Sequence, residues 1–320
     1  MAPLPSPQSR TVAAIYASHL ASRSTYRSAG IAVSEAGHEC DRAIWYRFRW
    51  ADAPSDIDGR KARLFDTGNR EEVRLIAELR AIGCEVLEVD PDTGNQYLLR
   101  LADGHLRGKA DGAVHGIPDA PATWHLLEAK THSAKNFKVL ASKGVATAFP
   151  KHFVQCQLGM HALGLTRALY LAACKDTDEI HAERLEYDAA FALRAEARAR
   201  RIAFADTVPW RISDNPDKPP CSWCPALAVC YRGEFPAGGD GVVARNCRTC
   251  LNSQPMAGGV WHCTQFERQL TLDEQREGCP SHLWLPSLVP GDQVDASEEA
   301  QTVTYAMRDG STFVDGRASA

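Results

Sequence analysis

The chain has 320 residues, of which 44% are hydrophobic and 24% charged, and its formal net charge is −4. This composition is typical of a globular protein with one large and one smaller domain, and it excludes a fibrous chain, a disordered chain and a uniformly basic nucleic-acid coat. No apolar run is long enough to span a bilayer and no apolar leader opens the chain, so we expect a cytosolic protein without a membrane partner.

The predicted elements mix helices and strands. Helical spacing predicts helices over 12–20, over 34–50 with Ser34 as N-cap, and over 64–82 with a stop at Gly83. Short apolar runs between turn residues predict strands near 85–88, 96–101, 106–115 and 123–130. Helices near 134–143 and 152–163, a strand near 168–173 and a helix over 188–204 follow. This order predicts a fold of the mixed α/β (α+β) class, in which helices flank a sheet of parallel and antiparallel strands.

The C-terminal third is rich in cysteine and poor in periodic apolar pattern. Eleven cysteines are many for a cytosolic chain, in which thiols hold metal more often than they form disulfides. The Gly- and Pro-rich stretch 236–242 predicts a linker. We therefore expect one domain over 1–235, a small Cys-rich module over 243–290 and a tail over 291–320.

Asp111, Glu128 and Lys130 form the central motif, in the segments Gly-Lys-Ala-Asp-Gly and Leu-Leu-Glu-Ala-Lys. On a strand, residues two apart share a face, so Glu128 and Lys130 are expected to point together while Leu127 and Ala129 face the core. An Asp on the neighbouring strand then completes a cation site, which we place at the edge of the sheet. Carboxylate-held Mg²⁺ neutralises charge on a phosphate and activates water, which the lysine orients. Alone this pattern is weak evidence for a metal site, because most proteins have charged side chains that point outward from the edges of their sheets.

Features around this motif support phosphodiester chemistry. Glu72 is a further candidate metal ligand, although acidic residues at a helix start also suit the helix dipole. Gln155 and Gln157 interrupt an apolar helix and, being costly to bury, indicate contacts near the site unless that helix end faces solvent. No Asp or Glu lies between Glu128 and Asp176. The lysines of this gap form either a solvated face or a surface for a phosphate backbone: Lys135, Lys138, Lys143 and Lys151.

Residues 65–173 resemble the RecB/YqaJ/lambda-exonuclease branch of the PD-(D/E)xK nucleases. The resemblance lies in the order of four motifs: Gly-x3-Glu, Gly-x2-Asp-Gly, Glu-x-Lys and Gln-x-Gln. The resemblance implies a restriction-endonuclease-like core and a metal-dependent nuclease. It also implies Mg²⁺ or Mn²⁺ at Asp111, Glu128 and the main-chain carbonyl of Ala129. Glu72 would be a further ligand, Lys130 the catalytic lysine, and Gln155 or Gln157 the family's glutamine. The family's Tyr after this glutamine is absent, with Gly159 and His161 at the candidate positions.

The first cysteine group, Cys221, Cys224 and Cys230, supplies three thiolates, one fewer than a tetrahedral zinc site or a cubane cluster needs. Cys40, far upstream at the head of a predicted helix, is the natural fourth ligand. One Cys before the core and C-x2-C-x5-C after it resembles the iron–sulfur nucleases of the AddB type, which implies a [4Fe–4S] cluster that ties the two ends of the fold together. Zn²⁺ is the alternative, because thiolates do not select the metal by spacing alone.

A second group has C-x2-C-x12-C-x15-C spacing, with His262 and His282 as substitute ligands: Cys247, Cys250, Cys263 and Cys279. Such spacing predicts a Zn²⁺ module that either staples the fold or binds DNA. Cys84, Cys156 and Cys174 lie in apolar surroundings and are expected to be buried thiols.

Together the patterns predict a Mg²⁺- or Mn²⁺-dependent DNA exonuclease of recombination, repair or phage DNA metabolism. Its expected partners are DNA and a single-strand annealing or recombination protein. The alternatives are an endonuclease on the same core, a catalytically inactive DNA-binding adaptor, and a redox or regulatory iron–sulfur protein. The sequence leaves the shape of the DNA channel and the oligomeric state open.

Overall fold

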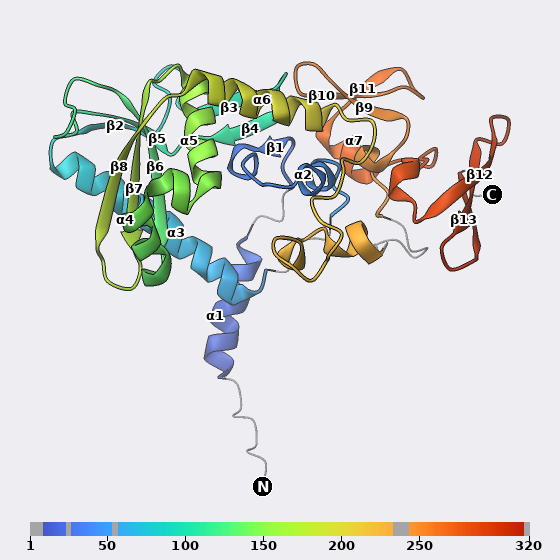
Figure 1. Ribbon diagram of the computed structural model, residues 1–320, viewed down its shortest axis with the longest axis horizontal. Coiled ribbons are helices and arrows are strands. Elements are labelled where there is room, and N and C mark those ends of the chain that lie inside the picture. Colours follow the sequence, from blue (N-terminus) through green and yellow to red (C-terminus); the bar gives the residue numbers. More distant parts are fainter. Residues whose placement is uncertain (1–8, 24–26, 53–56, 233–242, 317–320) are drawn as a thin grey trace, which may run out of the picture. The chain divides into compact units, whose positions relative to one another are not determined.

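The computed structural model describes residues 9–23, 27–52, 57–232 and 243–316 (Figure 1). The chain divides into two compact units and passes between them more than once. The first unit comprises residues 1–27, 55–97 and 109–187, and the second comprises residues 28–54, 98–108 and 188–320. The predicted linker at 236–242 lies outside the described residues, and the predicted domain boundaries around it remain predictions.

A five-stranded mixed sheet organises the first unit, in the order β2-β5-β6-β7-β8. β6 and β7 run parallel, and the other neighbouring pairs are antiparallel. The strands are β2 (Glu85–Leu87), β5 (Gly112–His115), β6 (His125–His132), β7 (Arg167–Cys174) and β8 (Ile180–Glu186). The predicted mixed α/β architecture is confirmed. The Glu-x-Lys motif, however, lies on the middle strand, so its predicted place at the edge of the sheet is wrong.

One face of this sheet is apolar and packs on α3 (Gly59–Ala81). Leu127 and Ala129 of β6 join the core on this face, as predicted, together with side chains from the helix and from β7: Leu75, Ile76, Leu79, Leu169, Leu171 and Ala173. The helix begins before the predicted residue 64, because the Asp58 side chain accepts a hydrogen bond from the Lys61 amide at 2.6 Å and caps it. α1 (Arg10–Ala21) contacts α3.

Two helices between β6 and β7 cover the opposite face: α4 (Ala134–Ala148) and α5 (Pro150–Leu163) (Figure 1). Gly159 lets α5 approach β6 closely, since a Cβ there would lie 2.6 Å from a methyl of Leu126. α4 kinks at Gly144, where φ is 69°, and the Glu183 carboxylate accepts a hydrogen bond from the Val145 amide at 2.8 Å. This face carries Glu128 and Lys130.

In the described part of the second unit, the strands form three small sheets, in the orders β1-β4-β3, β11-β10-β9 and β12-β13-β14. They are β1 (Ile31–Ala32), β3 (Leu98–Leu101), β4 (Leu106–Lys109), β9 (Ser253–Met256), β10 (Val260–Cys263), β11 (Arg268–Leu270), β12 (Gly291–Ser297), β13 (Thr302–Met307) and β14 (Thr312–Gly316). The helices are α2 (Asp41–Phe48), α6 (Ala189–Ala203) and α7 (Leu272–Glu277). Shorter helical turns are Val33–Glu35, Cys221–Trp223, Ala228–Arg232, Cys247–Thr249 and Pro286–Leu288.

A buried arginine joins distant segments of the second unit. Arg248 is 1% exposed, and its guanidinium donates hydrogen bonds to the main-chain carbonyls of Phe48 at 2.9 Å and Ala29 at 2.8 Å. It also lies over the Trp50 ring, 4.0 Å from the ring centroid. Fixed carbonyl acceptors and an aromatic face together compensate for the loss of water around a buried guanidinium. Arg248 therefore connects the cysteine-rich segment to the residues around α2.

The observed elements differ from the predicted ones in several places. Residues 33–35 form a separate 3-10 turn and α2 begins at Asp41 after Cys40, so the predicted helix over 34–50 with Ser34 as its cap is wrong. The predicted strand over 106–115 is two strands in different sheets, and Asp111 lies at the break between them. β8 was not predicted, and residues 291–316 form a three-stranded sheet where a tail was expected.

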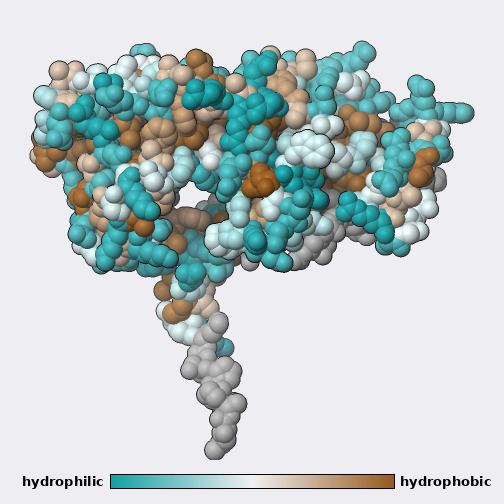
Figure 2. Space-filling view, viewed as in Figure 1, coloured by the Kyte–Doolittle hydropathy of each residue, from teal (hydrophilic) through white to brown (hydrophobic). Residues whose placement is uncertain are grey.

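The surface agrees with the composition. Hydrophilic side chains cover most of the face drawn in Figure 2, with hydrophobic ones scattered among them. Among the helices of the described residues, none combines the length and the apolar character needed to cross a bilayer.

Gly112 is expected to be sensitive to substitution, because its φ of +154° disfavours a side chain and a Cβ would lie 2.8 Å from the Leu87 carbonyl oxygen. Gly112→Ala should lower the free energy of unfolding by about 1–3 kcal/mol, as measured by urea denaturation. Gly116→Ala is the matched control, since its φ is +83° but its nearest neighbour lies at 3.7 Å. Equal losses in both variants would show that the close approach to Leu87 is unimportant.

Candidate active site

The predicted carboxylates and lysine come together at the middle of the first unit's sheet. Asp111 directly precedes β5, and its Oδ2 accepts a hydrogen bond from the Ala129 amide on β6 at 2.9 Å. Glu128 and Lys130 lie on either side of Ala129 and point to the face covered by α5, as period-two alternation requires. Asp111 is thus fixed by the main chain between the other two residues.

The Lys130 ammonium lies close to three oxygen atoms of the site. It forms an ion pair with Glu128 Oε1, donates to the Ala129 carbonyl at 3.1 Å and lies 3.8 Å from Asp111 Oδ2. These three oxygens are the ones that the sequence resemblance assigns to Mg²⁺ or Mn²⁺. One cationic nitrogen contacts them together, so their arrangement fits a small hard cation, which prefers carboxylate and carbonyl oxygens.

Burial gives the site unusual electrostatics. The Glu128 side chain is 3% exposed, whereas those of Asp111 and Lys130 are 21% and 24% exposed. Burial raises the pKa of Glu128 to about 7; the Lys130 charge opposes this rise, and the Asp111 charge adds to it. Burial by itself would lower the pKa of Lys130. The negative charges of Glu128 and Asp111 have a larger effect than burial and hold the pKa of Lys130 above its ordinary value. Lys130 is therefore a permanent cation at neutral pH and not a proton acceptor.

Glu72 of α3 lies within electrostatic range of these groups. Its pKa is raised by burial first and by the Asp111 charge second. Among the described residues, however, no group of three or more His, Cys, Asp or Glu side chains is positioned to hold a metal ion. The structure thus gives two carboxylates and a main-chain carbonyl around the Lys130 ammonium, and the assignment of these oxygens and of Glu72 to a metal ion stays a prediction.

The two glutamines of α5 have different surroundings. Gln157 is fully buried, and its Nε2 donates to the main-chain carbonyl of Glu186 at 2.7 Å. Gln155 is half-buried. Cys156, between these two glutamines, is under the influence of the carboxylate site, because burial and then the Glu128 charge hold its pKa well above its ordinary value. The assignment of either glutamine to the active site therefore stays a prediction.

The predicted basic residues lie on the two helices that cover this face. Three are exposed and one is half-buried: Lys135, Lys138 and Lys143 of α4, and Lys151 of α5. α4 and α5 both contact β6 and β7. The basic stretch seen in the sequence thus lies on the helices next to the carboxylate site, and its contact with DNA stays a prediction.

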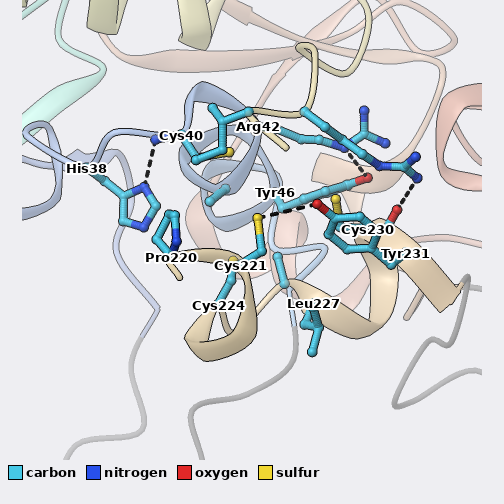
Figure 3. A pocket seen from close by; sticks show the side chains of 14 residues that line it. His38, Cys40, Arg42, Tyr46, Pro220, Cys221, Cys224, Leu227, Cys230 and Tyr231 are labelled. Carbon is cyan, nitrogen blue, oxygen red and sulfur yellow. Dashed lines mark hydrogen bonds between the residues drawn. The ribbon is translucent and has the colours of Figure 1, made fainter. Parts of the chain in front are cut away.

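All eleven cysteines are free thiols, and the four of the first predicted group line one pocket (Figure 3). Cys40 is the N-cap of α2, and Cys221, Cys224 and Cys230 come from two helical turns. The Tyr231 hydroxyl donates to Cys221 Sγ at 3.3 Å. Burial raises the pKa of Cys224, and the three other thiols act on it in the same direction. The fold therefore brings Cys40 to the downstream cysteines across about 180 residues of chain.

The second cysteine group also gathers in space. Burial raises the pKa of Cys247 to about 12, with Cys250, Cys279 and Cys263 as the next contributors in that order. His262 is half-buried on β10, and His282 is buried with its Nε2 3.1 Å from the Thr249 hydroxyl. Zinc at this group is not shown, since the described residues hold no preformed metal group. Cys84, Cys156 and Cys174 are buried, as predicted.

Comparison with known proteins gives weak structural similarities only. No family model and no curated protein matches the sequence. An alkaline exonuclease, LHK-Exo from Laribacter hongkongensis, is 15% identical with a TM-score of 0.38, covering 55% of this chain and 87% of that one. LHK-Exo in complex with dAMP gives 15% identity and a TM-score of 0.36, over 56% and 88% of the two chains. SSO0001 gives 15% identity and a TM-score of 0.42, over 70% and 98%. At these values the similarity assigns no activity to this chain.

A polar cluster that was not predicted from the sequence lies beside the site. His132, Tyr170 and His152 are linked by hydrogen bonds on the same face as Glu128 and Lys130. The position of His132 could have been predicted from the sequence, because His132 lies two residues after Lys130 and therefore shares the strand face of Glu128 and Lys130. Tyr170 and His152 carried no such signal, since their approach depends on strand pairing and on the packing of α5.

The raised pKa of Glu128 predicts a pH dependence of stability in chelator. The folded protein favours the protonated carboxyl, so this contribution is present below the ordinary pKa of 4.5 and is lost as pH rises towards about 7. The free energy of unfolding of the wild type should therefore fall relative to Glu128→Gln across this window. Urea denaturation at several pH values measures the difference, with the exposed Glu85→Gln as control. A pH-independent difference would contradict the raised pKa.

Proposed function

We propose that this chain is a metal-dependent deoxyribonuclease that degrades DNA from an end. The observation that carries the proposal is the convergence of Asp111 Oδ2, Glu128 Oε1 and the Ala129 carbonyl on one cationic nitrogen. Hydrolysis of a phosphodiester needs positive charge beside the phosphate and a water made nucleophilic, and a Mg²⁺ or Mn²⁺ ion on such oxygens supplies both. Glu72, from α3, is the proposed additional ligand.

The residues of the chain have separate tasks in this proposal. Asp111 and Glu128 hold the ion, and the Ala129 amide holds Asp111 in place. Lys130 keeps its proton at neutral pH, so it orients the attacking water and stabilises negative charge on the phosphate without accepting a proton. Gln155 or Gln157 completes the site from α5.

DNA is the proposed substrate because lysines follow the site on α4 and α5 without an intervening acidic residue. Lys135, Lys138, Lys143 and Lys151 would contact the phosphate backbone, whose charge is independent of base sequence. A role in recombination, repair or phage DNA metabolism, with a single-strand annealing or recombination protein as partner, suits an exonuclease. An endonuclease on the same site is the second candidate.

For the first cysteine group we propose a [4Fe–4S] cluster on Cys40, Cys221, Cys224 and Cys230. Four thiols line one pocket, which is the number of ligands that either a cubane cluster or a tetrahedral Zn²⁺ site needs. The cluster is preferred over Zn²⁺ because the order of one Cys before the core and C-x2-C-x5-C after it resembles that of iron–sulfur nucleases. Its role would be structural.

For the second cysteine group we propose Zn²⁺ as a folding staple. Its support is the ligand spacing and the mutual influence of the four thiols: Cys247, Cys250, Cys263 and Cys279. The surrounding strands β9, β10 and β11 are three or four residues long, and a sheet this small needs a staple other than an apolar core.

Asp111→Ala and Lys130→Ala are expected to reduce DNA cleavage at least about a hundredfold, because each removes part of the cation site or its orienting charge. The measurement is degradation of end-labelled linear DNA and of closed circular DNA with Mg²⁺, with Mn²⁺ and with chelator. The exposed Arg308→Ala, a basic residue outside this stretch, is the control and should cleave normally.

Metal-dependent loss of the linear DNA alone supports the exonuclease. Cutting of the circle favours the endonuclease, and no cleavage by the fully metallated protein would refute both and favour a DNA-binding adaptor. Normal activity of Lys130→Ala would refute the role given to the lysine.

Cys224→Ser is expected to lose iron and thermal stability together after anaerobic purification, since metal binding and folding of the loop are coupled. Cys250→Ser should lose zinc but keep iron, and the buried Cys174→Ser should keep both metals. Metal analysis and anaerobic optical spectra provide the measurement. Zinc instead of iron in the wild-type protein would show that the first group is a zinc site.

A further inference from the structure

A hydrogen-bonded chain of three aromatic residues extends from the carboxylate site. His132 lies two residues after Lys130 on β6, and its Nε2 is 2.9 Å from the Tyr170 hydroxyl. The same hydroxyl is 2.7 Å from His152 Nδ1 in the first turn of α5. Tyr170 pairs with Glu128 in the sheet register, so the chain begins next to the proposed metal ligand.

The rings of this chain are held by stacking as well as by hydrogen bonds. Phe149 stacks on His132 with ring centroids 4.4 Å apart and on His152 with centroids 5.2 Å apart. His132 and Tyr170 are buried, whereas His152 is half-buried and reaches the surface. The inner rings thus form a rigid support for one residue that a ligand can reach.

Fold stability alone gives little reason for these residue types. The opposite face of the same strands is built from Leu and Ala. A hydrogen-bonded polar group in a core contributes little more than an apolar side chain that fills the same space, and it is costly whenever one partner is missing. A polar trio beside the carboxylate site therefore indicates a function.

Both imidazoles are neutral at physiological pH. Burial lowers the pKa of His132 to about 4 and of His152 to about 3, and the Lys130 charge is the next cause for each. A neutral imidazole has one donor and one acceptor nitrogen, and a tyrosine hydroxyl has one proton to donate. Tyr170 must then donate to one histidine and accept from the other, so the three groups fix each other's proton positions.

We propose that His152 is a DNA-contacting residue whose Nε2–H donates to a phosphate oxygen of the bound strand. This inference rests on the proposed nuclease function. After burial, the groups that lower the pKa of His152 are Lys130, His132 and Lys151 in that order; the two lysines are positively charged, and such surroundings suit an anion. An anion requires a donor, so the order is His132 Nε2–H to Tyr170, Tyr170 O–H to His152 Nδ1, and His152 Nε2–H to phosphate. His132 and Tyr170 are positioning residues that act through His152.

The test measures DNA affinity in the full-length Asp111→Ala protein, in which cleavage is expected to be lost. His152→Ala should weaken binding of a labelled duplex about tenfold, the value for loss of one hydrogen bond to a charged group. Because a neutral donor releases no counterion, the slope of log Kd against log salt concentration should not change. Lys151→Ala, the matched control on the neighbouring residue, should reduce that slope by about one.

Two further variants distinguish a direct contact of His152 with DNA from a merely structural role of this residue. Gln can place an amide near the position of Nε2, so His152→Gln should recover most of the affinity. Tyr170→Phe keeps the ring and its stacking but removes the hydroxyl that sets the proton of His152, so it should weaken binding several-fold. The ¹⁵N chemical shifts of the histidine rings report the tautomers directly and should place the proton of His152 on Nε2.

Unchanged affinity in a folded His152→Ala protein, or a proton on Nδ1 of His152, overturns the inference while leaving the nuclease proposal intact. If the parent protein does not bind DNA at all, both the inference and the proposed function fall.

Discussion

The ion pair between Glu128 and Lys130 on the central strand is the constraint around which the first unit is arranged. Placing a carboxylate and an ammonium in a largely buried position has a desolvation cost of several kcal/mol for each ion, and their attraction offsets it only with good geometry. The geometry is supplied by the strand, which places the two side chains on one face, and by the main chain of Ala129 between them. Replacing a buried ion pair with well-packed apolar residues is often neutral or stabilising, so fold stability gives little reason for this pair and its presence indicates a function.

This constraint explains the difference between the two faces of the sheet. The face towards α3 is apolar and supplies the core. The face towards α4 and α5 carries the charged pair, then His132 and Tyr170, in a continuous polar layer. Both histidines on this face have a lowered pKa, first because they are buried and second because of the Lys130 charge. Burial and the charge of the site together thus determine which protonation states these neighbours adopt.

The second unit relies on different means of stabilisation. Its strands are short, and buried Arg248 joins Ala29 and the end of α2 to the segment after residue 243. Cys40 at the head of α2 meets cysteines that follow α6 in the sequence. Segments from both ends of the chain therefore meet in this unit, which is where a metal staple adds most, because it restricts long loops of the unfolded chain.

The sequence by itself determined the local features: the amphipathic α3, the shared face of Glu128 and Lys130, the inward direction of Leu127 and Ala129, and the buried thiols Cys84, Cys156 and Cys174. These depend on the period of a helix or strand and on near neighbours in the chain. Only the tertiary structure decided that β6 is central rather than at an edge, that the predicted strand around Asp111 is broken there, and that Tyr170 and His152 extend the site. Strand order and helix packing join residues that are distant in sequence, and burial, which sets the charge states of this site, exists only after they have met.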